Sequence, residues 1–133
     1  MANSQISNLK IVHGTAENFF QYYVPPNTLS YVVVNFPDPW PKKRHHKRRL
    51  FQEDFVESLV KVMQDKAVLV LATDEKSYLE EAIQSLRKSL DPVLPEPYYC
   101  EKQENYGGSW FENLWRSKGF SIFYTEFIKN TGI

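Results

Sequence analysis

Two continuous apolar runs separated by a helical segment constrain the fold most strongly. Residues 31–36 (YVVVNF) and 67–72 (AVLVLA) are apolar without alternation, which is typical of strands buried on both faces. Residues 51–63, between them, place apolar side chains at helical spacing. The order strand, helix, strand predicts an α/β fold whose sheet is largely parallel in its centre.

Shorter elements are expected on both sides of this unit. Residues 9–13 (LKIVH) predict a short buried strand, and residues 16–23 predict a short helix that ends before Pro25 and Pro26. The C-terminal part is expected to contain a proline-rich linker at 92–97, a weak strand at 98–104, a short helix or turn at 110–117 and a final strand at 120–128.

A second amphipathic helix is expected after the second apolar run. Thr73 or Asp74 can cap its start, and Pro92 ends it. The apolar residues of its inner stripe are Tyr78, Leu79, Ala82, Ile83, Leu86 and Leu90.

The composition favours a single domain at residues 1–133. The chain has 133 residues, of which 42% are hydrophobic, and this is enough for one core. Cys100 is the only cysteine, which excludes an intrachain disulfide framework and argues against a thiolate metal site. No apolar stretch resembles a signal peptide or reaches membrane-spanning length, so we expect a cytoplasmic protein that does not contact a membrane.

Charge is balanced overall but concentrated in one segment. Sixteen basic residues face sixteen acidic ones, yet six of the basic residues fall within eight positions. Without those six, ten basic residues remain against sixteen acidic ones, so one positive patch sits on an acidic body, as expected for a local polyanion site. A solvated basic loop or a nuclear-localization-like run is an equally open interpretation of the charge alone. The six are Lys42, Lys43, Arg44, Lys47, Arg48 and Arg49.

A proline-rich stretch carrying one carboxylate directly precedes this patch. In FPDPWP (residues 36–41) three prolines at alternate positions make the chain stiff and extended, which holds Asp38 in place. The alternative is an ordinary proline-rich loop whose aspartate caps a nearby element. Trp40 is either a core side chain, which its type slightly favours, or a platform for a base.

The basic patch has the residue types that bind phosphate. Arg44, Lys47 and Arg48 can lie on one side of a helical turn, where charge and bidentate hydrogen bonds favour phosphate. His45 and His46 lack the partners of a zinc site, so a phosphate or ribose contact is favoured over a metal, and we predict no metal site.

Two carboxylates follow the two apolar strands. Ligands bind α/β sheets at the carboxyl ends of the strands, where Asp38 and Asp74 are expected. If those strands are neighbours, the two carboxylates line one crevice.

Residues 35–50 (NFPDPWPKKRHHKRRL) resemble the signature of the bacterial tRNA (guanine-N7) methyltransferases. The stretch LATD, which ends at Asp74, and SWFENLWRSKGFSIFY near the C-terminus are similar to further elements of that family. The resemblance spans about residues 8–128. It implies a partial Rossmann-like fold of the S-adenosylmethionine-dependent methyltransferases, with an antiparallel last strand and the first two strands missing.

The resemblance also implies roles for individual residues. Asp38 would be the catalytic acid at the methyl donor and the guanine, and Thr15, Ala16 and Asp38 would contact S-adenosylmethionine. Thr15 stands where the family commonly has an aspartate, and Ser109 stands where it usually has a threonine. Residues 37–50 would form the loop facing tRNA. The substrate-binding set would be Lys42, Asp74, Ser109, Trp110, Phe111 and Glu112, and the RNA-binding set Arg44, His45, His46, Lys47, Arg48 and Arg49.

These residue types agree with methylation of guanine N7. That atom has a free lone pair, so no base is needed, and the site must supply alignment and negative charge for a guanine that becomes cationic. The carboxylates of Asp38, Asp74 and Glu112 can also accept hydrogen bonds from the guanine N1–H and amino group.

The family's glycine-rich cofactor turn and ribose-binding acid have no counterpart before Asn8. We therefore expect the strand at 31–36 to have an exposed edge that pairs with a missing N-terminal segment or with a second copy. This chain alone is expected to bind S-adenosylmethionine weakly and to be inactive. The alternatives are a non-catalytic RNA-binding module or partner subunit derived from such an enzyme, and a structural protein whose basic loop is incidental.

Overall fold

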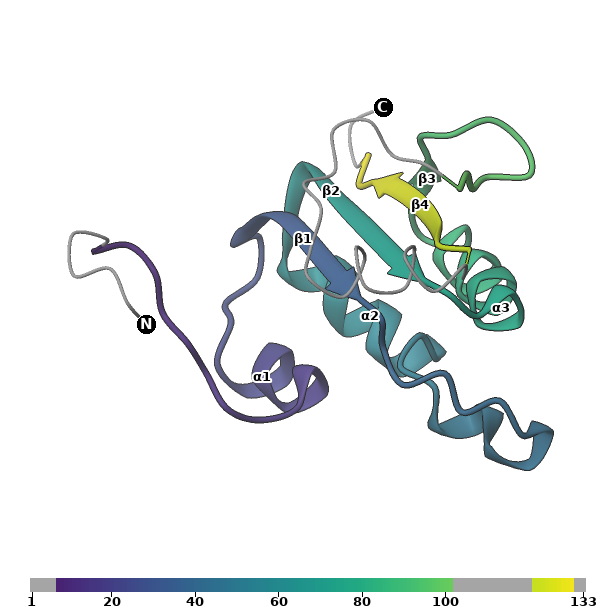
Figure 1. The fold of residues 1–133 in the computed structure, drawn as a ribbon. Helices are drawn as coiled ribbons and strands as arrows, with labels where there is room; N and C mark the ends of the chain where they lie inside the picture. The colour runs from purple at the N-terminus through teal and green to yellow at the C-terminus, as the bar shows by residue number, and fades with distance from the viewer. Residues whose placement is uncertain (1–6, 102–120, 131–133) are drawn as a thin grey trace.

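The computed structural model describes residues 7–101 and 121–130, which form a four-stranded sheet with helices packed against it (Figure 1). The strand order is β1-β2-β4-β3. The helices are α1 (Ala16–Tyr22), α2 (Glu53–Val62) and α3 (Lys76–Leu86), with one 3-10 helix at Lys43–Arg48. The strands are β1 (Leu29–Asn35), β2 (Met63–Thr73), β3 (Asp91–Pro92) and β4 (Phe123–Ile128).

The described sheet has one reversed strand. β1 pairs with β2 in parallel, with Asn35 opposite Ala72, while β4 is antiparallel both to β2 and to β3. The other strands therefore run in one direction, and β4, the last along the chain, runs against them. This confirms the expected α/β class, with mostly parallel strands and an antiparallel last strand.

The core lies between the sheet and the pair α2 and α3, which Figure 1 shows on one side of the sheet. Leu59 of α2, Leu69 of β2 and Leu79 of α3 have no exposed surface. Burying a side chain of this size contributes about 1.5–3 kcal/mol. All six residues predicted for the inner stripe are buried. Five of them lie in α3, which confirms its helical periodicity, and Leu90 follows the end of the helix.

β1 is not buried on both faces, so that prediction was wrong. Val32 and Val34 pack against the core, but Tyr31 is 59% exposed and Val33 is 42% exposed. The two faces differ because side chains alternate along a strand and the described helices cover only one side. Apolar composition alone could not show that one face lacks a cover among the described residues.

Residues 9–13 do not form the expected strand. They lie in an irregular segment, and Ile11 is 72% exposed. A strand requires a hydrogen-bonding neighbour, and the described part of the chain places none beside this segment.

The ends of the elements differ from the sequence expectation in smaller ways. The N-cap of α3 is Glu75, and the Thr73 hydroxyl oxygen accepts a hydrogen bond from its backbone N–H at 3.2 Å. α3 ends at Leu86, and Pro92 of the expected linker belongs to β3. Of the weak strand expected at 98–104, the structure describes only residues 98–101, where Cys100 forms an isolated bridge with Tyr124. Residues 102–120 lie outside the described part.

The described helices include none that is long and apolar enough to cross a membrane.

A buried lysine closes the C-terminal end of α2. Lys129 is 7% exposed, and its Nζ donates hydrogen bonds of 2.7 Å to the carbonyl oxygens of Val60 and Met63. The last carbonyls of a helix lack intrahelical donors and carry partial negative charge, so a buried ammonium satisfies both needs.

Replacing Lys129 with methionine should lower the free energy of unfolding by about 1–3 kcal/mol, because two buried carbonyls lose a charged donor. Urea denaturation measures this change. Lys61→Met is the matched control, because Lys61 is an exposed lysine of α2 and its replacement should change the urea midpoint little. Equal midpoints for the two variants would show that the buried bonds contribute nothing net.

Candidate functional site at the proline turn

The candidate site begins where β1 leaves the sheet. We call residues 36–41 (FPDPWP) the proline turn. The Phe36 N–H donates to the Ala72 carbonyl at 2.8 Å, so the turn starts beside the carboxyl end of β2. The two strands that precede Asp38 and Asp74 are thus neighbours, which was the condition for the two carboxylates to line one crevice.

Two bulky residues of the proline turn have left-handed backbone conformations. Phe36 has φ 49° and Trp40 has φ 43°. Such conformations cost about 1–3 kcal/mol each for residues with a side chain, and they gather at functional sites. Asp38 lies between these two strained residues, which makes it a candidate functional residue.

The basic segment, residues 42–49 (KKRHHKRR), folds back on the proline turn. Its 3-10 helix has three residues per turn, which aligns Arg44 with Lys47 on one exposed side. Five of the six cations of the segment are exposed, whereas Arg49 is 3% exposed. A continuous basic run in the sequence is therefore divided into an outer charged surface and one inner arginine.

Trp40 lies outside the hydrophobic core. Its half-buried ring stands 5.1 Å from the Arg48 guanidinium carbon and makes an edge contact with His45, with ring centroids 5.7 Å apart. The core role that its residue type slightly favoured is wrong. An indole ring ordered by two basic neighbours is instead available at the surface of the site.

An open cavity of about 450 Å³ joins the proline turn to the start of α1. It brings together Thr15, Ala16 and Asp38, the three residues predicted to contact the cofactor. α1 is held in place because Phe20 stacks on Phe55 of α2 with ring centroids 5.7 Å apart. The residues lining the cavity are Thr15, Ala16, Glu17, Pro37, Asp38, Trp40, Arg48 and Leu50.

Asp74 is not part of this cavity lining. It is half-buried and directly follows β2, one strand away from the proline turn. The described residues therefore bring Asp38 together with α1 rather than into one cavity with Asp74.

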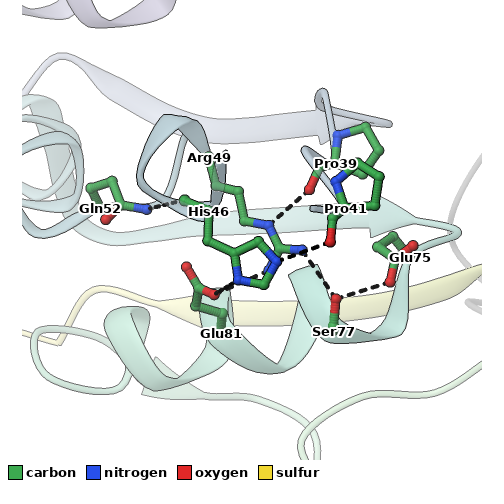
Figure 2. A network of polar contacts seen from close by, with 8 residues as sticks. All are labelled: Pro39, Pro41, His46, Arg49, Gln52, Glu75, Ser77 and Glu81. Atoms are coloured by element: carbon green, nitrogen blue, oxygen red, sulfur yellow. Dashed lines mark hydrogen bonds and ion pairs between the residues drawn. The ribbon is translucent and has the colours of Figure 1, made fainter. Parts of the chain in front are cut away.

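Arg49 links the proline turn to α3 (Figure 2). Its Nε donates to the Pro39 carbonyl at 2.8 Å, Nη1 donates to Glu81 Oε2 at 3.0 Å and Nη2 donates to the Ser77 hydroxyl oxygen at 3.0 Å. The guanidinium also lies 5.4 Å from the ring centre of Tyr78. The assignment of Arg49 to the RNA-facing surface is corrected, because internal acceptors hold its buried side chain.

His46 belongs to the same network. Its Nε2 lies 3.2 Å from the Pro41 carbonyl oxygen and must be the donor, since a carbonyl only accepts. Its Nδ1 lies 3.8 Å from Glu81 Oε2, and the ring is partly exposed. Of the two histidines, His46 thus faces the network and His45 faces Trp40.

Burial raises the pKa of the Tyr78 hydroxyl, so this group stays neutral at physiological pH. The Arg49 cation therefore stacks on a neutral ring, and Glu81 supplies the negative charge.

Other predicted residues are only partly placed. Lys42 is exposed just before the 3-10 helix. The set Ser109, Trp110, Phe111 and Glu112 lies outside the described residues. Within the described ranges, no group of three histidine, cysteine or acidic residues is arranged to hold a metal ion.

The sequence reasoning missed Ser77 and Glu81. They lie four positions apart and therefore on one face of α3, toward the proline turn. Their spacing was visible in the sequence, but nothing there indicated which segment they would meet.

Comparisons with known proteins agree on one family. A family model described as "Putative methyltransferase" matches residues 1–125. The tRNA (guanine-N(7)-)-methyltransferase of Chlamydia pneumoniae is 59% identical over 133 residues, and that of Chlamydia caviae is 56% identical over the same length. Both alignments cover 100% of this chain and 59% of the relative, so the chain spans about three fifths of the relatives' length.

Solved structures support the fold. A "Putatative DNA Modification Methylase" from Thermus thermophilus superposes with a TM-score of 0.58 at 15% identity, over 90% of this chain and 52% of its own. N-methyltransferase NodS from Bradyrhizobium japonicum gives a TM-score of 0.50 at 13% identity, over 84% of this chain and 56% of its own. The expected partial Rossmann-like methyltransferase fold is confirmed.

The contact between Arg48 and Trp40 can be tested by fluorescence. With Trp110 and Trp115 replaced by phenylalanine, Arg48→Ala should increase acrylamide quenching of Trp40, because the guanidinium no longer covers one ring face. An exposed cation–π contact contributes only about 0.5–1 kcal/mol, so the change should be modest, about twofold or less. Arg44→Ala is the control, and equal quenching in both variants would contradict the contact.

Proposed function

The chain belongs to the methyltransferase family whose model it matches, and we propose that the protein carrying it methylates N7 of a guanosine in tRNA, with S-adenosylmethionine as methyl donor. The observation that carries this proposal is 59% identity, over the whole chain, to a protein named tRNA (guanine-N(7)-)-methyltransferase. The activity is proposed for the protein rather than for this segment, because the segment matches only 59% of that relative.

The cavity suits the methyl-donor end of the cofactor. About 450 Å³ lies within the range of small-molecule sites, roughly 300–1,000 Å³. S-adenosylmethionine would supply a methyl group carried on a cationic sulfonium. The Thr15 hydroxyl and the backbone at Ala16 would bind its polar parts, and the Asp38 carboxylate would face its positive charge.

The chain's own residues would align guanine without removing a proton from N7. Asp38 would accept hydrogen bonds from the guanine N1–H and amino group, with Asp74 and Glu112 as further carboxylates of the substrate pocket. Trp40 would offer to the base the ring face that Arg48 does not cover, since Arg48 and His45 already order the ring. Negative charge near the base would stabilise the cationic methylated guanine.

The exposed part of the basic segment would bind the tRNA backbone. Lys42, Arg44, Lys47 and Arg48 have exposed side chains on one continuous segment beside the cavity. Each phosphate they neutralise would add to affinity in a salt-dependent way. His45, at the edge of Trp40, would lie between the phosphates and the base.

The exposed side of β1 would be covered in the complete assembly. Tyr31 and Val33 expose apolar surface, and among the described strands β1 pairs only with β2. The backbone groups at the unpaired edge of β1 would bind another strand, and the exposed face would be packed over, both by the rest of a longer protein or by a second copy. We place the protein in the cytoplasm, where tRNA is its substrate.

Changing Asp38 should separate catalysis from RNA binding. In the full-length protein, Asp38→Ala should lower single-turnover methylation of guanine N7 by about 100-fold or more, a typical loss for a preorganised charge in a site. The tRNA dissociation constant should change little, because phosphate contacts dominate affinity. Filter binding and methyl-transfer assays on one tRNA measure the two quantities.

The double variant Arg44→Ala, Lys47→Ala is the matched comparison. It should weaken tRNA binding and reduce the salt slope of log affinity by about 2, while methylation at saturating tRNA persists. Undiminished methylation by Asp38→Ala would rule out the assignment of the catalytic acid. An unchanged salt slope would mean that the exposed basic surface does not bind tRNA.

The 133-residue chain by itself should bind S-adenosylmethionine weakly and lack turnover. Titration calorimetry should give a dissociation constant at least about 100-fold above that of the full-length protein, a difference of about 2.7 kcal/mol in binding free energy. The physical reason is that this chain has no glycine-rich turn before α1 to wrap the cofactor. A dissociation constant for the 133-residue chain close to that of the full-length protein would contradict this proposal.

A further inference from the structure

We infer that Arg49 is a positioning residue for methyl transfer, which acts by anchoring the proline turn, and with it Asp38 and Trp40, to α3. The inference rests on the proposed function for its kinetic readout only. Its structural content is the network of Figure 2.

After Phe36, whose N–H binds the Ala72 carbonyl, the proline turn has few backbone donors with which to attach itself. Pro37, Pro39 and Pro41 have no backbone N–H, so every second residue of the turn lacks a donor, although each keeps a carbonyl that needs a partner. The prolines make the turn stiff without attaching it to the rest of the domain. Donors must therefore come from side chains, and Arg49 supplies one at the Pro39 carbonyl while His46 lies at the Pro41 carbonyl.

The Arg49 guanidinium contacts two elements at once. One nitrogen binds the turn, and the other two bind Ser77 and Glu81 on α3 at 3.0 Å each. Ser77 is oriented in turn, since its hydroxyl donates to Glu75 Oε1 at 2.9 Å. A planar guanidinium can make these contacts together, whereas a lysine ammonium on a flexible stem cannot reproduce the same fork.

Burial and charge exclude a phosphate-binding role for this side chain. Arg49 is 3% exposed, and a buried cation is stable only with a paired anion, which Glu81 provides at 3.0 Å. A phosphate would have to displace that carboxylate and would be repelled by it. Arg48, the preceding residue, is exposed and stands over Trp40 instead.

The anchored atom lies between the two functional residues of the turn. Pro39 is bonded to both Asp38 and Trp40, so movement of its carbonyl moves both side chains. Misplacement of a reacting group by about 1 Å can cost about 100-fold in rate. Loss of the Arg49 contacts should therefore slow the chemical step while the outer basic surface still binds tRNA.

Arg49→Lys in the full-length protein tests this role, because it keeps the charge and removes the fork. We expect kcat to fall about 10- to 100-fold, with the tRNA dissociation constant and its salt slope within about twofold of wild type. Arg87→Lys is the matched control. Arg87 also stacks on a tyrosine, with its guanidinium 4.4 Å from the Tyr98 ring, but it lies outside the site and should keep wild-type kcat.

Glu81→Gln supplies a second, independent test. It is expected to lower kcat without weakening tRNA binding, since the change removes negative charge from α3. Combined with Arg49→Lys, it should add little further loss, because both changes break the same link. Fully multiplicative losses in the double variant would mean that the two residues act separately.

A loss of rate must be distinguished from a loss of folded protein. Single-turnover rates are therefore measured per folded molecule, at a temperature where circular dichroism shows that each variant is folded. Wild-type rates for Arg49→Lys under these conditions would overturn the inference. So would a loss of tRNA affinity that matches the loss of kcat, because that result identifies Arg49 as an RNA contact.

A readout without activity completes the test. In the protein whose only tryptophan is Trp40, Arg49→Lys should increase acrylamide quenching, as the turn loses its anchor, and Arg87→Lys should not. Unchanged quenching would contradict the anchoring. A wild-type protein that does not methylate guanine would count against the proposed function, whereas the quenching result decides the anchoring by itself.

Discussion

Parallel pairing of β1 with β2 is the interaction on which the rest of the structure depends. Because Asn35 lies opposite Ala72, the chain leaves β1 beside the carboxyl end of β2 and close to the start of α3. The proline turn therefore emerges where α3 can reach it. Without that register, Arg49 could not bind Pro39 and α3 together, and the turn would have no anchor.

The basic segment divides its charges between two tasks that the run itself does not distinguish. Its exposed cations present a surface that suits phosphate, while Arg49 and His46 turn inward toward carbonyls of the proline turn. The 3-10 helix sends successive side chains about 120° apart around its axis. Arg49 follows the helix as its C-cap, in an extended backbone conformation, and its side chain reaches the Pro39 carbonyl. One segment can thus bind a polyanion and hold a stiff turn in place.

Among the described residues, the two faces of the sheet differ in how far helices cover them. α2 and α3 bury one face of the sheet, whereas Tyr31 and Val33 of β1 and the irregular residues 9–13 expose apolar surface. The chain also spans only 59% of the relatives it matches. The cavity at Thr15 and Asp38 lies at the start of α1, a helix that packs on α2 through Phe20 and Phe55.

Periodicity and composition were sufficient for the elements of the fold, because burial of an apolar stripe depends on local spacing: α2, α3 and the two central strands were predictable from it. The motif NFPDPWPKKRHHKRRL likewise identified the family. Only the tertiary structure decided three properties. They are the covering of a single face of β1, the position of Trp40 and the choice of the arginine that points inward. Those properties depend on contacts between residues far apart in sequence, such as Arg49 with Glu81, and a charge run contains no information about the carboxylate that one of its members will meet.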